Sequence, residues 1–182
     1  MTRRPLRLLA IDLTAKGFGC ALLDAKLGLL DWVFSPVPAT DDPTFIARLS
    51  KRIERGRPTA LVVENFAPVK GRENALRRRE IVVRLAAERH IGMCHVSRKV
   101  VQRVLGVRTK AEIARTLAVR FPELQSRMPP ERTPWANEDE RMHIFDALSF
   151  AFAVVGPMDE IITPAREQGE EEGGYVRVRN EQ

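Results

Sequence analysis

The chain has 182 residues, 44% of them hydrophobic and 30% charged, with a formal net charge of +6. This length suits one domain around a single core, and we find neither a membrane-spanning apolar run nor a secretory signal segment, so membrane and secreted classes are not expected. From Pro157 on, seven acids face three arginines, which gives that segment −4 and leaves +10 on residues 1–156, a balance that suits a polyanion such as nucleic acid.

The first three elements are predicted to be strands. Apolar runs over 8–14 and 19–23 predict a hairpin, and residues 27–34 predict a third strand. Asp12 ends the first run, where a buried carboxylate is costly unless something pairs with it. Two interpretations of Asp12 remain open at this point, namely a residue that starts a turn and a residue that reaches a ligand.

A helix and a fourth strand follow. Asp41-Asp42-Pro43 is typical of a helix start, apolar residues recur at helical spacing as far as Ile53, and Gly56-Arg57-Pro58 is expected to end the helix. The strand over 60–63 ends on Glu64, as the first strand ends on Asp12. Parallel strands with helical crossovers bring their carboxyl ends to one edge, so these two acids are expected to lie together unless Glu64 is only a solvated strand end.

The middle of the chain is basic. A loop over 66–71 precedes a long helix over 72–90, whose arginines form either a solvated face or a surface for DNA or a second subunit. Phe66 is a candidate base-stacking residue beside it. A fifth strand over 92–96 and two short helices, over 99–105 and 109–121, come next.

The last helix is predicted to begin at Glu138 and to end at Gly156-Pro157. His143 and Asp146 are three residues apart and therefore share one face of it. A histidine beside an acid on such a helix is often structural, but oxygen ligands hold Mg²⁺ or Mn²⁺ and an imidazole is tolerated. We expect a domain over 1–163 and a disordered acidic tail over 164–182.

This order of elements, with Asp12, Glu64 and His143-x-x-Asp146-Ala147 in these places, resembles the ribonuclease H-like superfamily, and within it the RuvC-type Holliday-junction resolvases, over residues 6–156. The resemblance implies an α/β fold with a mixed five-stranded sheet and helices on both faces. It also implies a homodimeric endonuclease that nicks four-way DNA junctions in recombination and repair. Two Mg²⁺ ions per active site, replaceable by Mn²⁺, would be held by Asp12, Glu64, His143 and Asp146.

The resemblance also has gaps. The usual opening Asp-Pro-Gly is here Asp12-Leu13-Thr14, and the glycine loop after the first short helix is shorter. Residues expected to contact DNA are Phe66, Lys70, Arg72, Lys99, Arg103 and Lys110, of which the last three are candidates for the scissile phosphate.

Three other functions are alternatives to a junction-cleaving nuclease. They are a related nuclease that acts on RNA, a non-catalytic DNA-binding module, and a sugar-kinase or actin-like nucleotide-binding protein. The last needs two such domains, and the chain supplies only one. Cys20 and Cys94 fall in predicted strands as small core residues, which together with the absent signal segment suggests a cytoplasmic protein without a membrane partner.

Overall fold

A computed structural model describes residues 5–130 and 138–162 and contains five strands and six helices in this part of the chain. The elements in chain order are β1 (Arg7–Leu13), β2 (Gly17–Asp24), β3 (Leu29–Pro36), α1 (Asp42–Gly56), β4 (Ala60–Glu64), α2 (Glu73–Glu88), β5 (Gly92–Val96), α3 (Arg98–Leu105), α4 (Lys110–Arg120), the 3₁₀ helix η1 (Pro122–Arg127) and α5 (Met142–Ile162). All five predicted strands are present, and their order with the helices is as expected.

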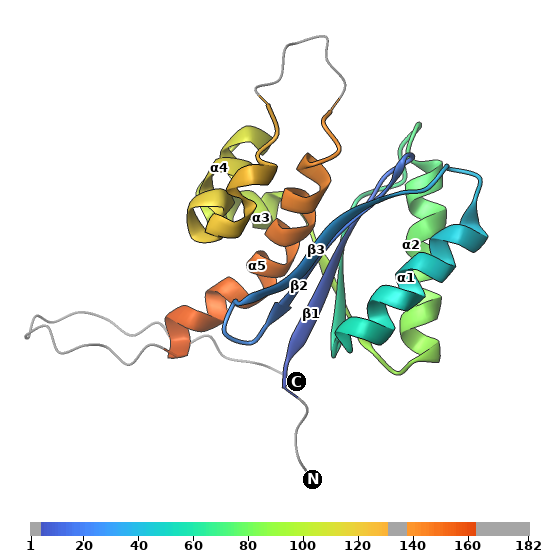
Figure 1. The fold of residues 1–182 in the computed structure, drawn as a ribbon, viewed down its shortest axis with the longest axis horizontal. Coiled ribbons are helices and arrows are strands. Elements are labelled where there is room, and N and C mark those ends of the chain that lie inside the picture. The colour runs from blue at the N-terminus through green and yellow to red at the C-terminus, as the bar shows by residue number, and fades with distance from the viewer. Residues whose placement is uncertain (1–4, 131–137, 163–182) are drawn as a thin grey trace, which may run out of the picture.

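The sheet is mixed and has the order β3-β2-β1-β4-β5. Strand β1 pairs antiparallel with β2 and parallel with β4, and β5 continues the parallel half. Helices α1 and α2 cover one face, and α3, α4 and α5 lie on the other (Figure 1). The predicted fold class, a mixed five-stranded sheet with helices on both faces, is confirmed.

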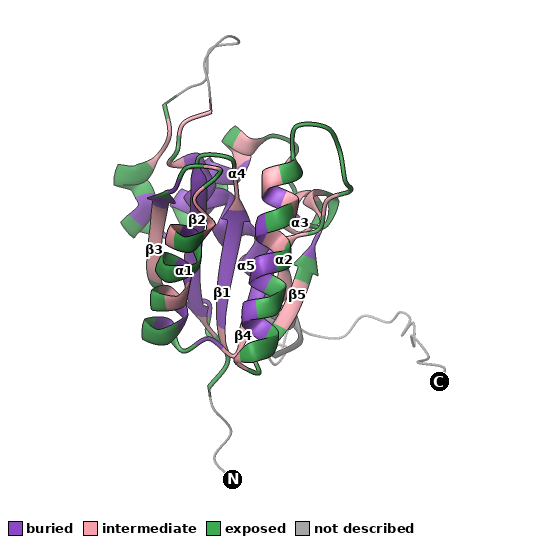
Figure 2. Cartoon of the chain, turned by 90° about the vertical axis from the view of Figure 1, so that its right-hand side faces the viewer, coloured by how far each residue is buried: buried purple, intermediate pink, exposed green. Residues whose placement is uncertain are grey.

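The central strand separates two hydrophobic cores (Figure 2). Side chains alternate between the two faces of a strand, so Leu8 and Ala10 pack on the α5 side and Leu9 and Ile11 on the α1 and α2 side. All four are at most 2% exposed. The run reads as continuously apolar because both faces of β1 are covered, and Asp12 comes next on the α5 side.

The helix starts follow from their local sequence. The Asp41 carboxylate accepts a hydrogen bond from the backbone N–H of Thr44 and caps α1, as predicted, and Arg57 ends that helix in the left-handed region. A reciprocal capping box joins Thr109 and Glu112 at the start of α4.

Two boundaries of α5 were predicted wrongly. The helix begins at Met142 rather than at Glu138, because the Asp139 carboxylate accepts the backbone N–H of Arg141 and holds the preceding residues in a turn. It also continues through Gly156-Pro157 to Ile162. Proline removes one backbone donor and usually kinks a helix, but here it does not end it.

Two further differences lie earlier in the chain. The third strand starts two residues late, at Leu29, because the Asp24 carboxylate accepts the N–H groups of Lys26 and Gly28 and forms a turn in which Leu27 takes a positive φ of 59°. The 3₁₀ helix η1 was not predicted. Arg78, counted among the surface arginines, is fully buried.

Cys20 is buried, Cys94 is partly buried, and neither forms a disulfide. Among the described residues, no helix has the length and hydropathy needed to cross a bilayer. The predicted tail over 164–182 lies outside the described residues.

Candidate active site

Two of the predicted acids lie at one edge of the sheet. The register pairs Ile11 of β1 with Val63 of β4, so Asp12 and Glu64 are each the next residue on neighbouring parallel strands. Asp12 is 6% exposed, and the Glu64 side chain is 12% exposed. Strand ends therefore bring these two carboxylates together as the sequence predicted.

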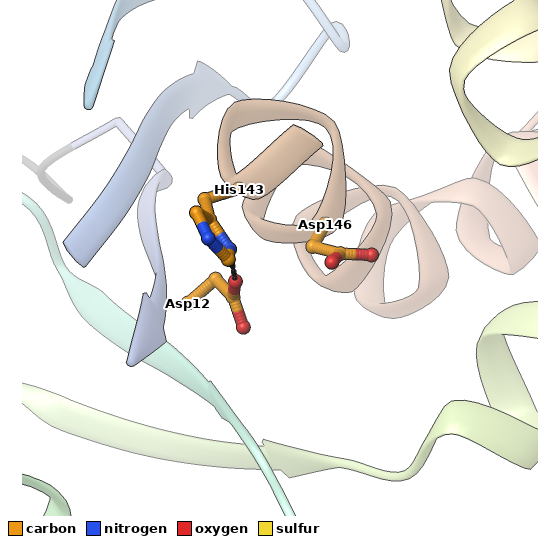
Figure 3. A group of neighbouring side chains, drawn as sticks. All are labelled: Asp12, His143 and Asp146. Carbon is orange, nitrogen blue, oxygen red and sulfur yellow. Dashed lines mark hydrogen bonds and ion pairs between the residues drawn. The ribbon is translucent and has the colours of Figure 1, made fainter. Parts of the chain in front are cut away.

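The first turn of α5 brings the other two predicted ligands to the same edge (Figure 3). Gly19, the antiparallel partner of Asp12 on β2, lies under this turn, and a Cβ built on it would come within 2.1 Å of the His143 backbone oxygen. Only a glycine lets α5 approach the sheet this closely. His143 Nδ1 consequently lies 2.8 Å from Asp12 Oδ2.

The His143 ring is held from a second side. The Phe34 ring of β3 stacks on it with a centroid separation of 5.4 Å and an interplanar angle of 27°. Asp146, one turn further along α5, is fully buried. Side-chain ligand atoms of Asp12, His143 and Asp146 all lie within 4.8 Å of one another, whereas Glu64 does not join this group.

Burial perturbs the titration of the Asp12–His143 pair. Desolvation raises the pKa of Asp12 to about 6, against the opposing effect of its hydrogen bond to His143. Burial by itself would lower the pKa of His143, but the hydrogen bond to Asp12 and the charge of that carboxylate outweigh it and leave the pKa raised. Burial is thus the main reason why the Asp12 carboxylate is unfavourable, and a cation bound beside it would favour its ionised form.

Two cations hold Asp146. Arg98, the first residue of α3, forms an ion pair and hydrogen bond with one carboxylate oxygen, and Lys110, the first residue of α4, lies 2.8 Å from the other. Lys110 also pairs with Glu138 at 2.6 Å. Both helices begin at the site, so each contributes its first side chain to it.

Arg98 reaches a second acid. Its Nε lies 3.7 Å from Glu64 Oε1, and its guanidinium lies over the Phe150 ring at 5.4 Å from the centroid. Arg98 was not among the site residues predicted from the sequence. It lies two residues past the end of β5, a parallel strand that ends at the same edge as β4, and that position was the available signal.

These residues surround a cleft of about 180 Å³. Its lining includes Asp12, Glu64, Arg72, Arg98, Lys110 and His143. Both carboxylates and cations line it, so the cleft can take both a metal ion and an anionic group.

The six residues predicted to contact DNA fall into three groups. Lys110 and Arg72 line the cleft, and Arg72 pairs with Glu64 at 3.5 Å. Phe66 lies between the guanidinium groups of Arg72 and Arg79, at 4.8 and 4.9 Å from its centroid. The structure does not bring the remaining three to the cleft: Lys70, Lys99 and Arg103 are exposed and outside its lining.

Comparison with known proteins identifies the fold. No family model and no curated protein matches the chain. Among solved structures, Thermus thermophilus RuvC in complex with a Holliday junction substrate is 20% identical, with a TM-score of 0.61 over 81% of this chain and 91% of that one. A second structure of Thermus thermophilus RuvC is 19% identical and gives the same TM-score over 85% and 97% of the two chains. Yeast mitochondrial Holliday junction resolvase Ydc2 is 15% identical, with a TM-score of 0.53 over 82% and 78%.

Proposed function

We propose that this protein is a metal-dependent endonuclease that nicks four-way DNA junctions, acting in the cytoplasm in recombination and repair. The starting point is its fold, which is that of the RuvC and Ydc2 resolvases. The observation that carries the proposal is the convergence of Asp12, His143 and Asp146, with Glu64 lining the same cleft. Three residues from β1 and α5 come together, and Glu64 of β4 lines the adjoining cleft, which supports the proposed metal site.

The donor set fits a divalent cation. Carboxylate oxygens and an imidazole nitrogen are accepted ligands of such ions, and a bound ion would replace the proton that Asp12 Oδ2 and His143 Nδ1 now share at 2.8 Å. The raised pKa of Asp12 marks a carboxylate that a cation would stabilise. We propose Mg²⁺ as the physiological ion with Mn²⁺ as a substitute, since one nitrogen in the set suits Mn²⁺. In phosphodiester hydrolysis such ions neutralise charge at the phosphate and lower the pKa of water.

The chain's own residues would orient the substrate. As the family resemblance implies, His143 and Asp146 would hold the first ion, Glu64 would hold the second, and Asp12 would help to hold both. Lys110 lies on the cleft rim with its side chain 40% exposed, where it can meet a phosphate. The Phe66 ring is contacted by the Arg72 and Arg79 guanidinium groups, so an unpaired base would stack on it by displacing one of them.

The decisive experiment is cleavage of a synthetic four-way DNA junction with Mg²⁺, with duplex DNA and a four-way RNA junction as comparison substrates. We expect symmetric nicks on the DNA junction, and none with Asp12→Asn, which should bind the junction as well as the wild type or better in a gel-shift assay. Asp31→Asn is the matched control. Asp31 lies on β3 and pairs with Arg52, and this variant should cleave normally. Faster cleavage of the RNA junction would overturn the substrate assignment in favour of an RNA nuclease.

We further propose that the active form is a homodimer, because a two-fold junction needs two active sites for paired nicks. The sequence of helix α2 has more apolar residues than one sheet-facing stripe requires, which predicts a contact with a second subunit; they are Leu76, Ile81, Val82, Val83 and Leu85. Ile81, Val82 and Leu85 instead face the core, which leaves Val83, 41% exposed, as support on that helix. Light scattering at micromolar protein, with and without junction DNA, should give twice the monomer mass, and a monomer in both conditions would contradict the proposal.

A further inference from the structure

We propose that Arg98 occupies the position of the second divalent cation, so that the DNA-free protein binds one divalent ion and the second site forms only when Arg98 is removed or drawn away. This inference rests on the proposed metal site, and it assigns different roles to two ion positions that the family resemblance treats alike.

The contacts of Arg98 set it apart from the other cations of the cleft. Among the described residues it alone forms ion pairs with two of the proposed ligands, Glu64 of β4 and Asp146 of α5. Lys110 reaches Asp146 but pairs otherwise with Glu138. Arg72 reaches only Glu64. Arg98 therefore lies between the Asp146 ligand of the first ion and Glu64, and an ion held by Glu64 would have to compete with its guanidinium.

Arg98 is also held firmly in place. Its side chain is 24% exposed, compared with 40% for Lys110 and 45% for Arg72, and the Phe150 ring packs against the guanidinium. Ser97 caps α3 through its side chain, which fixes the helix end that carries Arg98. A guanidinium cannot be deprotonated at ordinary pH, so the charge stays in the site.

The grouping of the acids agrees with this assignment. Asp12, His143 and Asp146 come together as one set of possible ligands, and Glu64 is left out of that set on the side where Arg98 lies. The first ion position is therefore preformed, and the second is already neutralised by a side chain.

Charge balance gives the same result. Three carboxylates line the cleft, from Asp12, Glu64 and Glu138, and the buried Asp146 pairs with two of its cations; Arg72, Arg98 and Lys110 supply three positive charges against these four. The net charge of these seven groups is −1, and one bound divalent ion changes it to +1. A second ion would then add two charges beside Arg98, which is unfavourable until a DNA phosphate arrives or the guanidinium is absent.

The test is a Mn²⁺ titration of DNA-free protein, with free Mn²⁺ followed by electron paramagnetic resonance. The wild type should bind one Mn²⁺ per chain. Arg98→Ala and Arg98→Gln should bind two, with the second ion at least about tenfold tighter than in the wild type, because a like charge a few ångströms away has gone. Arg98→Lys, which keeps a positive charge, should remain close to one.

Arg103→Ala is the matched control, since Arg103 lies on the same helix but is exposed outside the cleft lining. It should bind one ion like the wild type. Melting curves check that each variant folds, and the loss of Arg98 leaves Lys110 on Asp146 and Arg72 on Glu64. Two Mn²⁺ of similar affinity in the wild type, or one Mn²⁺ in folded Arg98→Ala and Arg98→Gln, would overturn the inference.

These outcomes are separable from those of the junction assay. Junction cleavage together with an unchanged stoichiometry in Arg98→Ala removes only the role of Arg98. The expected change from one ion to two, without junction cleavage, retains the role of Arg98 and removes the proposed substrate.

Discussion

The three proposed carboxylate ligands are neutralised by different sets of partners. Asp12 depends on His143, Asp146 on Arg98 and Lys110, and Glu64 on Arg72 and Arg98. The strength of these partners also differs, because an imidazole can lose its proton whereas arginine keeps its charge. Substitutions at these positions should therefore have distinct effects on metal binding and on stability.

His143 can be tested by changing the type of ligand atom. His143→Asp should retain measurable junction cleavage, because a carboxylate also donates a lone pair, and His143→Ala should lose most of it. The ratio of Mn²⁺-supported to Mg²⁺-supported nicking rates should fall in His143→Asp, since an all-oxygen set suits Mg²⁺ better. If His143 only holds α5 on the sheet, through its stacking on Phe34, both variants should lose stability and the ratio should stay constant.

The Asp12–His143 pair predicts a pH dependence of stability in chelator-treated protein. Both pKa values are raised, so between about pH 4 and 7 the folded site binds more protons than the unfolded chain, and its contribution to stability is lost as the pH rises. A pKa about two above its ordinary value corresponds to roughly 3 kcal/mol when the carboxyl ionises.

Asp12→Asn removes this carboxyl and should be more stable than the wild type by about 1–3 kcal/mol at pH 7.5, with the difference shrinking as the pH falls and disappearing below about pH 4. Urea denaturation at several pH values measures it. Asp31→Asn provides the baseline. A difference that does not vary with pH would show that Asp12 has no raised pKa.

At the scale of elements, the packing of α5 on β2 decides whether the site exists. Gly19→Ala would place a methyl group 2.1 Å from the His143 carbonyl oxygen, and backbone on both sides limits relaxation. We expect a loss of about 3 kcal/mol or more in the free energy of unfolding, together with weaker Mn²⁺ binding, because α5 must move away from Asp12.

Gly92→Ala is the comparison variant, since its added methyl would meet nothing closer than Thr59 oxygen at 3.3 Å on edge strand β5. It should change stability by less than about 1 kcal/mol. Equal effects of the two substitutions in denaturation experiments would contradict the role of Gly19.

Strand ends were the part of the site that sequence could predict. Apolar runs followed by an acid gave the positions of Asp12 and Glu64, since local periodicity determines both the strand and its end. Helical spacing likewise put His143 and Asp146 on one face. The fold class followed from the element order together with the family resemblance.

Contacts between distant segments could not be predicted in this way. Arg98 looks like any arginine at a helix start until β4 and α5 supply its two partners. Arg78 was assigned to a surface, but it donates hydrogen bonds to carbonyl groups of Thr14, Gly17, Val37 and Pro38 and packs on the Phe45 ring. Buried charge with backbone partners leaves no periodic signal.

At the scale of the whole molecule, charge is unevenly distributed along the chain. Residues 1–156 carry +10 and the segment from Pro157 carries −4. Deletion of residues 164–182 should leave junction cleavage nearly unchanged and tighten DNA binding by a few fold at about 50 mM salt, because an acidic segment opposes a polyanion and salt screens the effect. Gel-shift titrations at low and high salt measure this, and weaker binding after deletion would contradict it.

The 131 residues that separate Asp12 from His143 also order events during synthesis. The ribosome makes β1 early, and this strand stays without part of its cover until α5 emerges with His143 and Asp146. A nascent chain can thus fold much of its sheet while the ion site is still incomplete. The ion site that we propose therefore cannot be complete until translation has passed residue 146.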